Sequence, residues 1–274
     1  MPLLLIILAS LIRLASLLAH AGPPVDIEKF SVIIDQQKFY QMGDLLVDDR
    51  FINSNGDQDA NDPRQSGARP EQVILWEDGV LPIEFKKNVN QNLRRLVFQA
   101  CSEWSQYANV RCQLGSYKKR KLKIGRSFLG VKTGCWSMLG QADYVFGIKR
   151  RMNLGPHCDN YETVLHELGH AFGLTHEHQR SDRDQYVEVL RENIKDQFMG
   201  FTYKLNFMQQ STELLTPYDF LSIMHYRQNA FTKNGQDTIR PRAGYEKYAD
   251  HIGHAKHLSE LDQFAIRALY GARE

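Results

Sequence analysis

Residues 166–176 read HELGHAFGLTH. His166 and His170 are four positions apart, so on a helix both imidazoles lie on one face, and Glu167 stands beside them. Gly173 can adopt the positive φ that ends a helix, which would bring His176 back as a third nitrogen ligand. Three protein ligands leave one position for water, so the stretch predicts a catalytic Zn²⁺ site with one ion per chain. The alternative is a helix that carries several buried histidines.

The chain begins with a leucine-rich segment. Residues 1–21 end in Ala19-His20-Ala21, a small-x-small pattern typical of a secretory signal peptide, so we expect a secreted, extracellular protein. Arg13 interrupts the apolar run and leaves too short a span for a bilayer, which disfavours a membrane anchor. We expect no stable membrane insertion elsewhere. Four cysteines in a secreted chain then favour two disulfides.

Composition excludes few functions. At 274 residues, the chain can form one domain of about 200 residues with additional segments. A net charge of +2 is too near zero to indicate a nucleic-acid partner. The basic clusters at residues 118–123 and 149–151 are typical of solvated loops or strand edges, and no nucleic-acid fold signature accompanies them.

Hydrophobic patterning predicts an α+β fold. Helical spacing marks helices over residues 91–104, 161–172 and 260–270. Short apolar runs predict strands at residues 81–85, 110–114, 122–124 and 144–148. We therefore expect an N-terminal half with a sheet and two long helices, including the histidine helix, and a loop-rich C-terminal half with a last helix.

A polar segment separates two parts of the chain. Residues 48–71 are rich in Asn, Asp, Gly and Pro, a composition typical of a linker that proteases cut easily. Residues 22–47 are too short to fold alone, so we interpret them as part of a prosegment that docks on the following domain.

Several motifs together resemble the astacin family of secreted zinc endopeptidases, within the metzincins. The histidine stretch continues as HEHQRSDRD, with Glu177 at the family's position after the third histidine. Residues 222–226 read SIMHY, residues 134–137 read GCWS, and Leu75-Trp76 with Gly79-Val80-Leu81-Pro82 matches the start of the family's mature domain. The resemblance covers about residues 67–270. It implies a twisted, mostly parallel sheet in the N-terminal half and a Met-turn in the C-terminal half.

The resemblance assigns further residues to the site. Met224 would lie in the Met-turn beneath the metal, and Tyr226 would be an additional zinc ligand that swings away to bind the developing oxyanion. Glu177 would meet the new amino terminus after activation and organise the site. His178 and His225 would be structural, because the motif already fills the ligand set.

A family switch motif has a partial match in the prosegment. Residues 41–44 read QMGD, where the family has FxGD, so Asp44 would bind the metal and exclude the catalytic water. Gln41 departs from the family's Phe, and Tyr40 or Phe39 would serve in its place. The implied organisation is a signal peptide at 1–21, a prosegment at 22–66 and a catalytic domain at 67–274. An activating protease would cut between about Arg64 and Arg69.

The cysteines match the family only in part. Cys135 and Cys158 match a family pair beside the substrate cleft. The second family disulfide would need cysteines near Asn109 and Gly271, and both are missing. Cys101 and Cys112 remain. They form a substitute bridge only if their Cα atoms lie within about 7 Å, and the sequence leaves this open.

The implied reaction is hydrolysis of internal peptide bonds in proteins or peptides. Glu167 would take the proton of a metal-activated water and pass it to the leaving amine. Substrate would add as an extra strand along an edge strand at residues 144–148. Arg242, with Arg240 as second choice, would read an acidic residue after the scissile bond. The alternatives are an inactive zinc-binding adhesion or signalling protein on the same fold, and a different metzincin.

Overall fold

The structure is a computed structural model, and it describes residues 31–34, 37–42, 45–48, 73–118, 120–126, 134–141, 151–195, 206–210 and 212–273. One mixed sheet organises the N-terminal half, in the order β1-β2-β3-β7-β8-β6-β4-β5. β4, β5, β6 and β8 are parallel, and β7 is antiparallel to β8. The strands are β1 (Ser31–Ile34), β2 (Gln37–Met42), β3 (Leu45–Asp48), β4 (Val80–Phe85), β5 (Arg111–Leu114), β6 (Leu122–Gly125), β7 (Cys135–Met138) and β8 (Arg151–Leu154).

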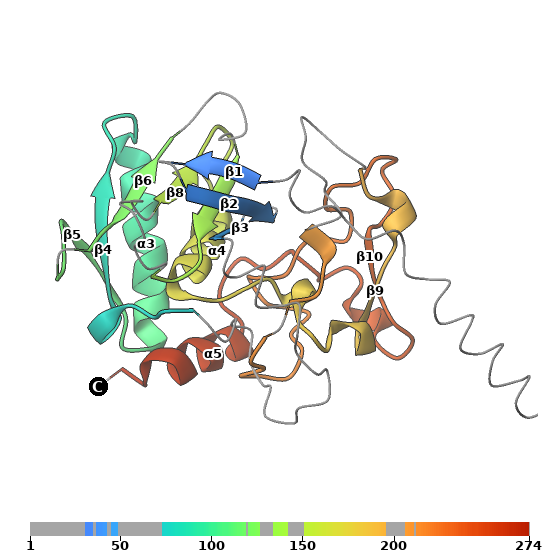
Figure 1. Ribbon diagram of the computed structural model, residues 1–274. Coiled ribbons are helices and arrows are strands. Elements are labelled where there is room, and N and C mark those ends of the chain that lie inside the picture. Colours follow the sequence, from blue (N-terminus) through green and yellow to red (C-terminus); the bar gives the residue numbers. More distant parts are fainter. Residues whose placement is uncertain are drawn as a thin grey trace, which may run out of the picture.

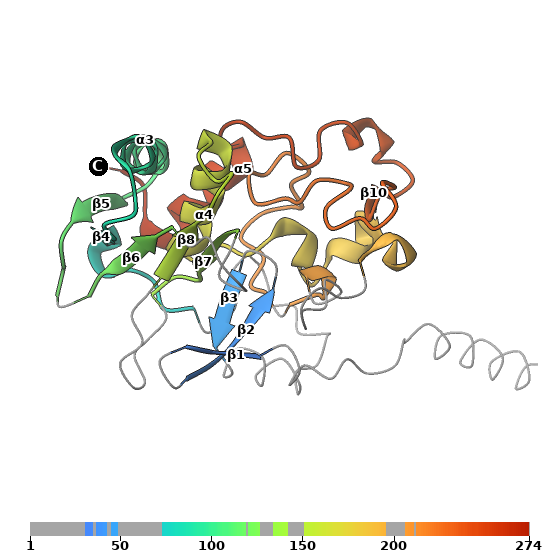
Figure 2. The same cartoon turned by 90° about the horizontal axis from the view of Figure 1, so that it is seen from above.

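The N-terminal segment extends this sheet. β1, β2 and β3 pair as antiparallel neighbours. β3 then pairs with β7 in parallel, with Leu45 opposite Ser137 and Leu46 opposite Met138. Figure 2 shows these blue strands beside β7. The backbone edge of β7 that faces away from β8 is therefore occupied by residues from the N-terminal segment.

Three helices in the described part of the chain complete the fold, namely α3 (Gln91–Tyr107), α4 (Tyr161–Phe172) and α5 (Glu260–Tyr270). Each begins at a side chain that caps the first turn: Asn90, Asn160 and Ser259 accept a bond from the backbone N–H three residues later. α3 packs against both α4 and α5. The buried face of α3, which includes Leu93, Val97, Ala100 and Trp104, joins the main hydrophobic core with the sheet and α4.

The C-terminal half is loop-rich, as expected. It contains the two-stranded sheet of β9 (Val187–Val189) and β10 (Ile239–Pro241) and short 3-10 turns at Glu177–Gln179, Arg183–Gln185, Arg191–Asn193 and Glu246–Tyr248. A second, aromatic cluster holds these loops together through Phe207, Tyr218, Phe220, Tyr226 and neighbouring residues. In Figure 1 this half lies beside the sheet.

The structure confirms the α+β fold class and the mostly parallel sheet. The helices at 161–172 and 260–270 match α4 and α5, whereas α3 continues three residues beyond Trp104 to Tyr107. Sequence analysis missed the strands at Cys135–Met138 and Arg151–Leu154. The strand expected at residues 144–148 lies outside the described residues.

Two disulfides join the described elements. Cys135 on β7 is bonded to Cys158, and Cys101 on α3 is bonded to Cys112 on β5 with a Cα–Cα distance of 6.2 Å. The sequence left open whether Cys101 pairs with Cys112, and the structure shows that it does. Asn109 and Gly271, where the family's other disulfide would lie, are also neighbours: the Asn109 N–H donates to the Gly271 carbonyl at 3.0 Å. A backbone hydrogen bond thus connects the two points that lack cysteines.

Candidate metal centre

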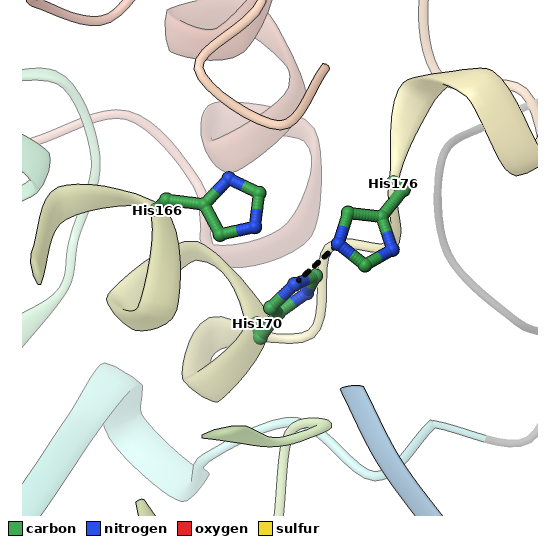
Figure 3. Close-up of side chains that lie close together, drawn as sticks. All are labelled: His166, His170 and His176. Atoms are coloured by element: carbon green, nitrogen blue, oxygen red, sulfur yellow. Dashed lines mark hydrogen bonds between the residues drawn. The ribbon is translucent and has the colours of Figure 1, made fainter. Parts of the chain in front are cut away.

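Three histidines converge at the end of α4. His166 and His170 project from one face of the helix, and Gly173 ends the helix at φ 107°. A Cβ at Gly173 would also lie only 3.0 Å from Val73 Cγ1, so a larger residue would be both strained and crowded there. The chain turns back after this glycine, and Figure 3 shows His176 facing the other two imidazoles.

Each imidazole is fixed through its Nδ1 atom. The acceptors are the Ile223 carbonyl for His166, the Leu174 carbonyl for His170 and the side-chain Oε1 of Gln179 for His176, each at 2.7 Å. Because these oxygens accept, Nδ1 carries the proton in each ring and Nε2 keeps its lone pair. This is the tautomer that a metal ligand needs.

The three rings fit a metal ion. Their ligand atoms lie within 4.8 Å of one another. Nε2 of His170 and Nε2 of His176 are 3.1 Å apart. Two nitrogens bound to one tetrahedral zinc at about 2.0–2.1 Å would be roughly 3.3 Å apart, so the spacing is close to that of a zinc site. Three imidazole ligands suit Zn²⁺, so the residues present fit the ion that the sequence predicts.

Glu167 directly follows His166 on α4, and Met224 contacts the same helix. Glu167 is only 1% exposed although it carries a carboxyl group. Met224 packs against α4 from the Met-turn, where a Cβ at Gly169 would overlap Met224 Sδ and approach Trp104 to 3.2 Å. Gly169 therefore lets the Met-turn lie directly against the helix between the two ligand histidines.

Tyr226 lies beside the histidines. Its ring centroid is 4.4 Å from that of His176 and 4.1 Å from that of His178, on which it stacks. The two neighbouring histidines have other partners: His178 bonds to the Asn206 carbonyl, and His225 lies between the Tyr218 hydroxyl and the Tyr226 carbonyl. Burial lowers the pKa of His225 to about 4 and that of His178 well below its usual value, so both rings are neutral.

Glu177, the residue after His176, is buried. Its Oε1 atom accepts bonds from the guanidinium of Arg180 at 2.8 Å and from the Asp219 N–H at 2.7 Å. Burial raises the pKa of Glu177 to about 8, against the effect of Arg180. Glu177, Asp219 and Asp262 together line a cavity of about 10 Å³, which is roughly the space of one water molecule.

The remaining candidates are not brought to the centre by any described contact. Arg240 on β10 is exposed and forms an ion pair with Glu188 on β9 at 2.6 Å. Arg242 is exposed, and its backbone N–H donates to the Tyr186 carbonyl. Asp44 lies outside the described residues, although β2 and β3 on either side of it are described.

Sequence reasoning missed the acceptors that orient the imidazoles. Ile223 and Leu174 act through backbone carbonyls, which no motif of side chains reveals. Gln179 could have been found, because it lies three residues after His176 and carries a side-chain acceptor.

Three comparisons bear on this arrangement. The model of the peptidase family Astacin matches residues 68–271. Bone morphogenetic protein 1 of Xenopus laevis is 35% identical over 216 residues, which are 76% of this chain and 28% of that protein. Zinc metalloproteinase nas-15 of Caenorhabditis elegans is 30% identical over 265 residues, 94% of this chain and 44% of that protein. The chain thus spans less than half the length of these two relatives.

A solved structure of a zinc-protease has a similar fold. High choriolytic enzyme 1, a hatching enzyme zinc-protease from Oryzias latipes, superimposes with a TM-score of 0.62 at 28% identity. The match covers 73% of this chain and 94% of that structure. The family model, the fold and the three convergent histidines agree, and the chain belongs to the astacin family of peptidases.

Proposed function

We propose that this protein is a secreted zinc endopeptidase that is made as a latent proenzyme. The observation that carries the proposal is the set of three imidazoles, each fixed through Nδ1. The buried Glu167, which directly follows His166 on α4, supplies a carboxyl group. A metal-dependent hydrolase uses a metal that activates water and a base within reach of that water. The family's named relatives include zinc metalloproteinases.

The chemistry follows from the residues around the centre. When bound, zinc lowers the pKa of its water ligand to about 7 and polarises a substrate carbonyl. Glu167 accepts the water proton and passes it to the leaving amine. Tyr226 donates a hydrogen bond to the tetrahedral oxyanion, and a Tyr226→Phe variant should lower kcat more than it changes KM if this is correct.

The substrate is a protein or peptide in extended conformation. β7 packs against α4, and in this chain β3 pairs with the edge of β7 that faces away from β8. An extended substrate pairs with that edge once the N-terminal segment has left. Arg242 is our candidate for selecting an acidic residue, since Arg240 is already paired with Glu188. Cleavage of a peptide library by wild type and Arg242→Ala would test this selection.

Metal dependence tests the proposed activity. The activated protein should cleave a denatured protein, stop when a chelator removes zinc, and recover when zinc is restored, because the only activated water is the one on the metal. A cysteine- or serine-protease inhibitor should have no effect. Cleavage that continues at full rate in the metal-free protein would rule out the mechanism.

Latency is supported by the position of the N-terminal segment. We assign residues 1–21 to a signal peptide, 22–66 to a prosegment and 67–274 to the catalytic domain. β3 occupies the edge of β7 in parallel orientation, so an extended substrate cannot pair there at the same time. Asp44 immediately precedes β3, and we propose that its carboxylate takes the open position on zinc.

Replacing Asp44 tests this switch. The uncleaved Asp44→Ala chain should show measurable activity, because water could then reach the metal, while β3 still limits substrate access. Asp48→Ala, at the other end of β3, is the matched control and should stay latent. Hydrolysis of a short fluorogenic peptide before any activating protease is added gives the measurement. Full latency of Asp44→Ala would leave the aspartate switch without support.

Activation would create a new amino terminus near residues 64–69. The cavity between Glu177, Asp219 and Asp262 is the size of one water molecule, so it could hold an ammonium group surrounded by carboxylates. A mature chain with one additional N-terminal residue should then be less active, because its ammonium group would no longer reach Glu177.

Secretion is supported by the two disulfides, which persist in oxidising compartments. No helix among the described residues is long and apolar enough to cross a membrane. The other candidate function, an inactive zinc-binding adhesion or signalling protein, is disfavoured because Glu167 and all three histidines are present. Such a protein would bind zinc but fail the cleavage assay.

A further inference from the structure

Hydrogen bonds continue from His166 beyond its first acceptor. His166 Nδ1–H donates to the Ile223 carbonyl at 2.7 Å. That carbonyl belongs to the same peptide group as the Met224 N–H, which donates to Ser222 Oγ at 2.9 Å. The Ser222 hydroxyl in turn donates to Asp262 Oδ1 at 2.7 Å. An imidazole, a peptide group, a hydroxyl and a carboxylate thus form one continuous relay from His166 to Asp262.

Every donor in this relay points toward the carboxylate. A peptide group is polarised by resonance, so a stronger bond at its N–H makes its oxygen a better acceptor. A hydroxyl that donates to a carboxylate also accepts more strongly, because the bond to an ionised acceptor is roughly twice as strong as a neutral one. The negative charge of Asp262 therefore strengthens each hydrogen bond of the relay in turn. The last bond that it strengthens is the one that His166 Nδ1–H donates.

Asp262 is held firmly at the end of the relay. It is the third residue of α5, and its Oδ2 atom accepts from the Ser259 N–H at 3.0 Å and from the Ile223 N–H at 2.9 Å. All of these partners are donors, which suits the ionised carboxylate. Burial raises the pKa of Asp262 to about 6, and the group is still mostly ionised at pH 7. The N-terminal cap of α5 thereby also anchors the Met-turn.

The other two ligands are fixed differently. His170 donates to the Leu174 carbonyl, and His176 donates to the Gln179 amide, both of which are neutral acceptors. His166 is also partly exposed, whereas His170 and His176 are 0% exposed. Of the three imidazoles, that of His166 is therefore restrained least by packing. The relay connects this imidazole to a charged group.

We propose that Ser222 and Asp262 are positioning residues for the metal, through a carboxylate–hydroxyl–peptide relay that orients His166 and strengthens Nε2 as a zinc ligand. This inference rests on the proposed zinc site. Partners outside the ligand set commonly contribute 10–100-fold to metal affinity. Because two groups separate the carboxylate from His166, we expect a value near the lower end of this range.

Zinc affinity of the full chain tests the relay. Ser222→Ala removes the hydroxyl link, and Asp262→Asn removes the charge; each should weaken zinc binding by about tenfold in competition with a chromogenic chelator. Ser259→Ala is the matched control, because it removes the side-chain cap of the same helix but keeps the backbone donor to Asp262. It should lower the unfolding temperature and leave zinc affinity within twofold of wild type.

The outcomes separate the relay from a general loss of structure. Zinc binding within twofold of wild type in both Ser222→Ala and Asp262→Asn would overturn the proposal. So would an equal loss in Ser259→Ala, since the cause would then be a weakened α5. Asp262→Asn answers the question if Ser222→Ala fails to fold. The readout does not need proteolysis: weaker zinc binding in a protein that cleaves nothing would support the relay and contradict only the proposed activity.

Discussion

Glu167→Ala is expected to lower kcat by roughly 10²–10⁴-fold, the usual contribution of general acid–base catalysis. Glu167 is 1% exposed on α4 and directly follows His166, and we propose that it is the general base. Alanine keeps the helix and all three imidazoles. Zinc content, measured after gel filtration, should therefore equal that of the wild type while turnover collapses.

The same helix offers a matched control for this variant. Glu162 lies five residues earlier, in the first turn of α4, where it forms an ion pair with Lys256. Exposed pairs of this kind contribute at most about 1 kcal/mol to stability. Glu162→Ala should therefore keep kcat/KM within about twofold. If Glu167→Ala is as active as Glu162→Ala, Glu167 is not the general base.

His170→Ala should abolish zinc binding at micromolar metal. His170 is fully buried, with Nδ1 bonded to the Leu174 carbonyl and Nε2 3.1 Å from His176 Nε2. Loss of a residue that only orients a ligand lowers metal affinity by roughly 10–100-fold, and loss of the ligand itself should lower it further. Only two imidazoles would remain. Activity should disappear with the metal, and added zinc should not restore it.

An exposed histidine provides the comparison. His254 lies on the surface of the C-terminal half, so His254→Ala should bind one zinc ion per chain as the wild type does. The zinc content of both variants is measured by metal analysis. Their unfolding temperatures are measured with and without zinc, because a ligand that binds only the folded state raises the unfolding temperature. A His170→Ala protein that still binds one zinc ion tightly would contradict the ligand set.

Local patterns predicted the helices of this fold well. α4 and α5 begin at capping residues and end at glycines, and both signals are contained in a few neighbouring positions. α3 ended later than expected because Ser105 to Tyr107 continue the helix without a stop signal. The strands at Cys135–Met138 and Arg151–Leu154 were missed, since a strand of four residues has little periodicity and depends on its neighbours for pairing.

The sequence by itself determined the reactive groups: two histidines and a glutamate at helical spacing, a glycine that lets the chain turn, and a third histidine at the right distance. These depend on helix geometry and on the freedom of Gly173, which are local properties. Only the tertiary structure decided which atoms orient them. The Ile223 carbonyl lies 57 positions from His166, Asp262 lies 40 positions from Ser222, and β3 pairs with β7 across a long stretch of chain. Such contacts form through packing and backbone pairing, in which almost any sequence can supply a carbonyl, so no motif records them.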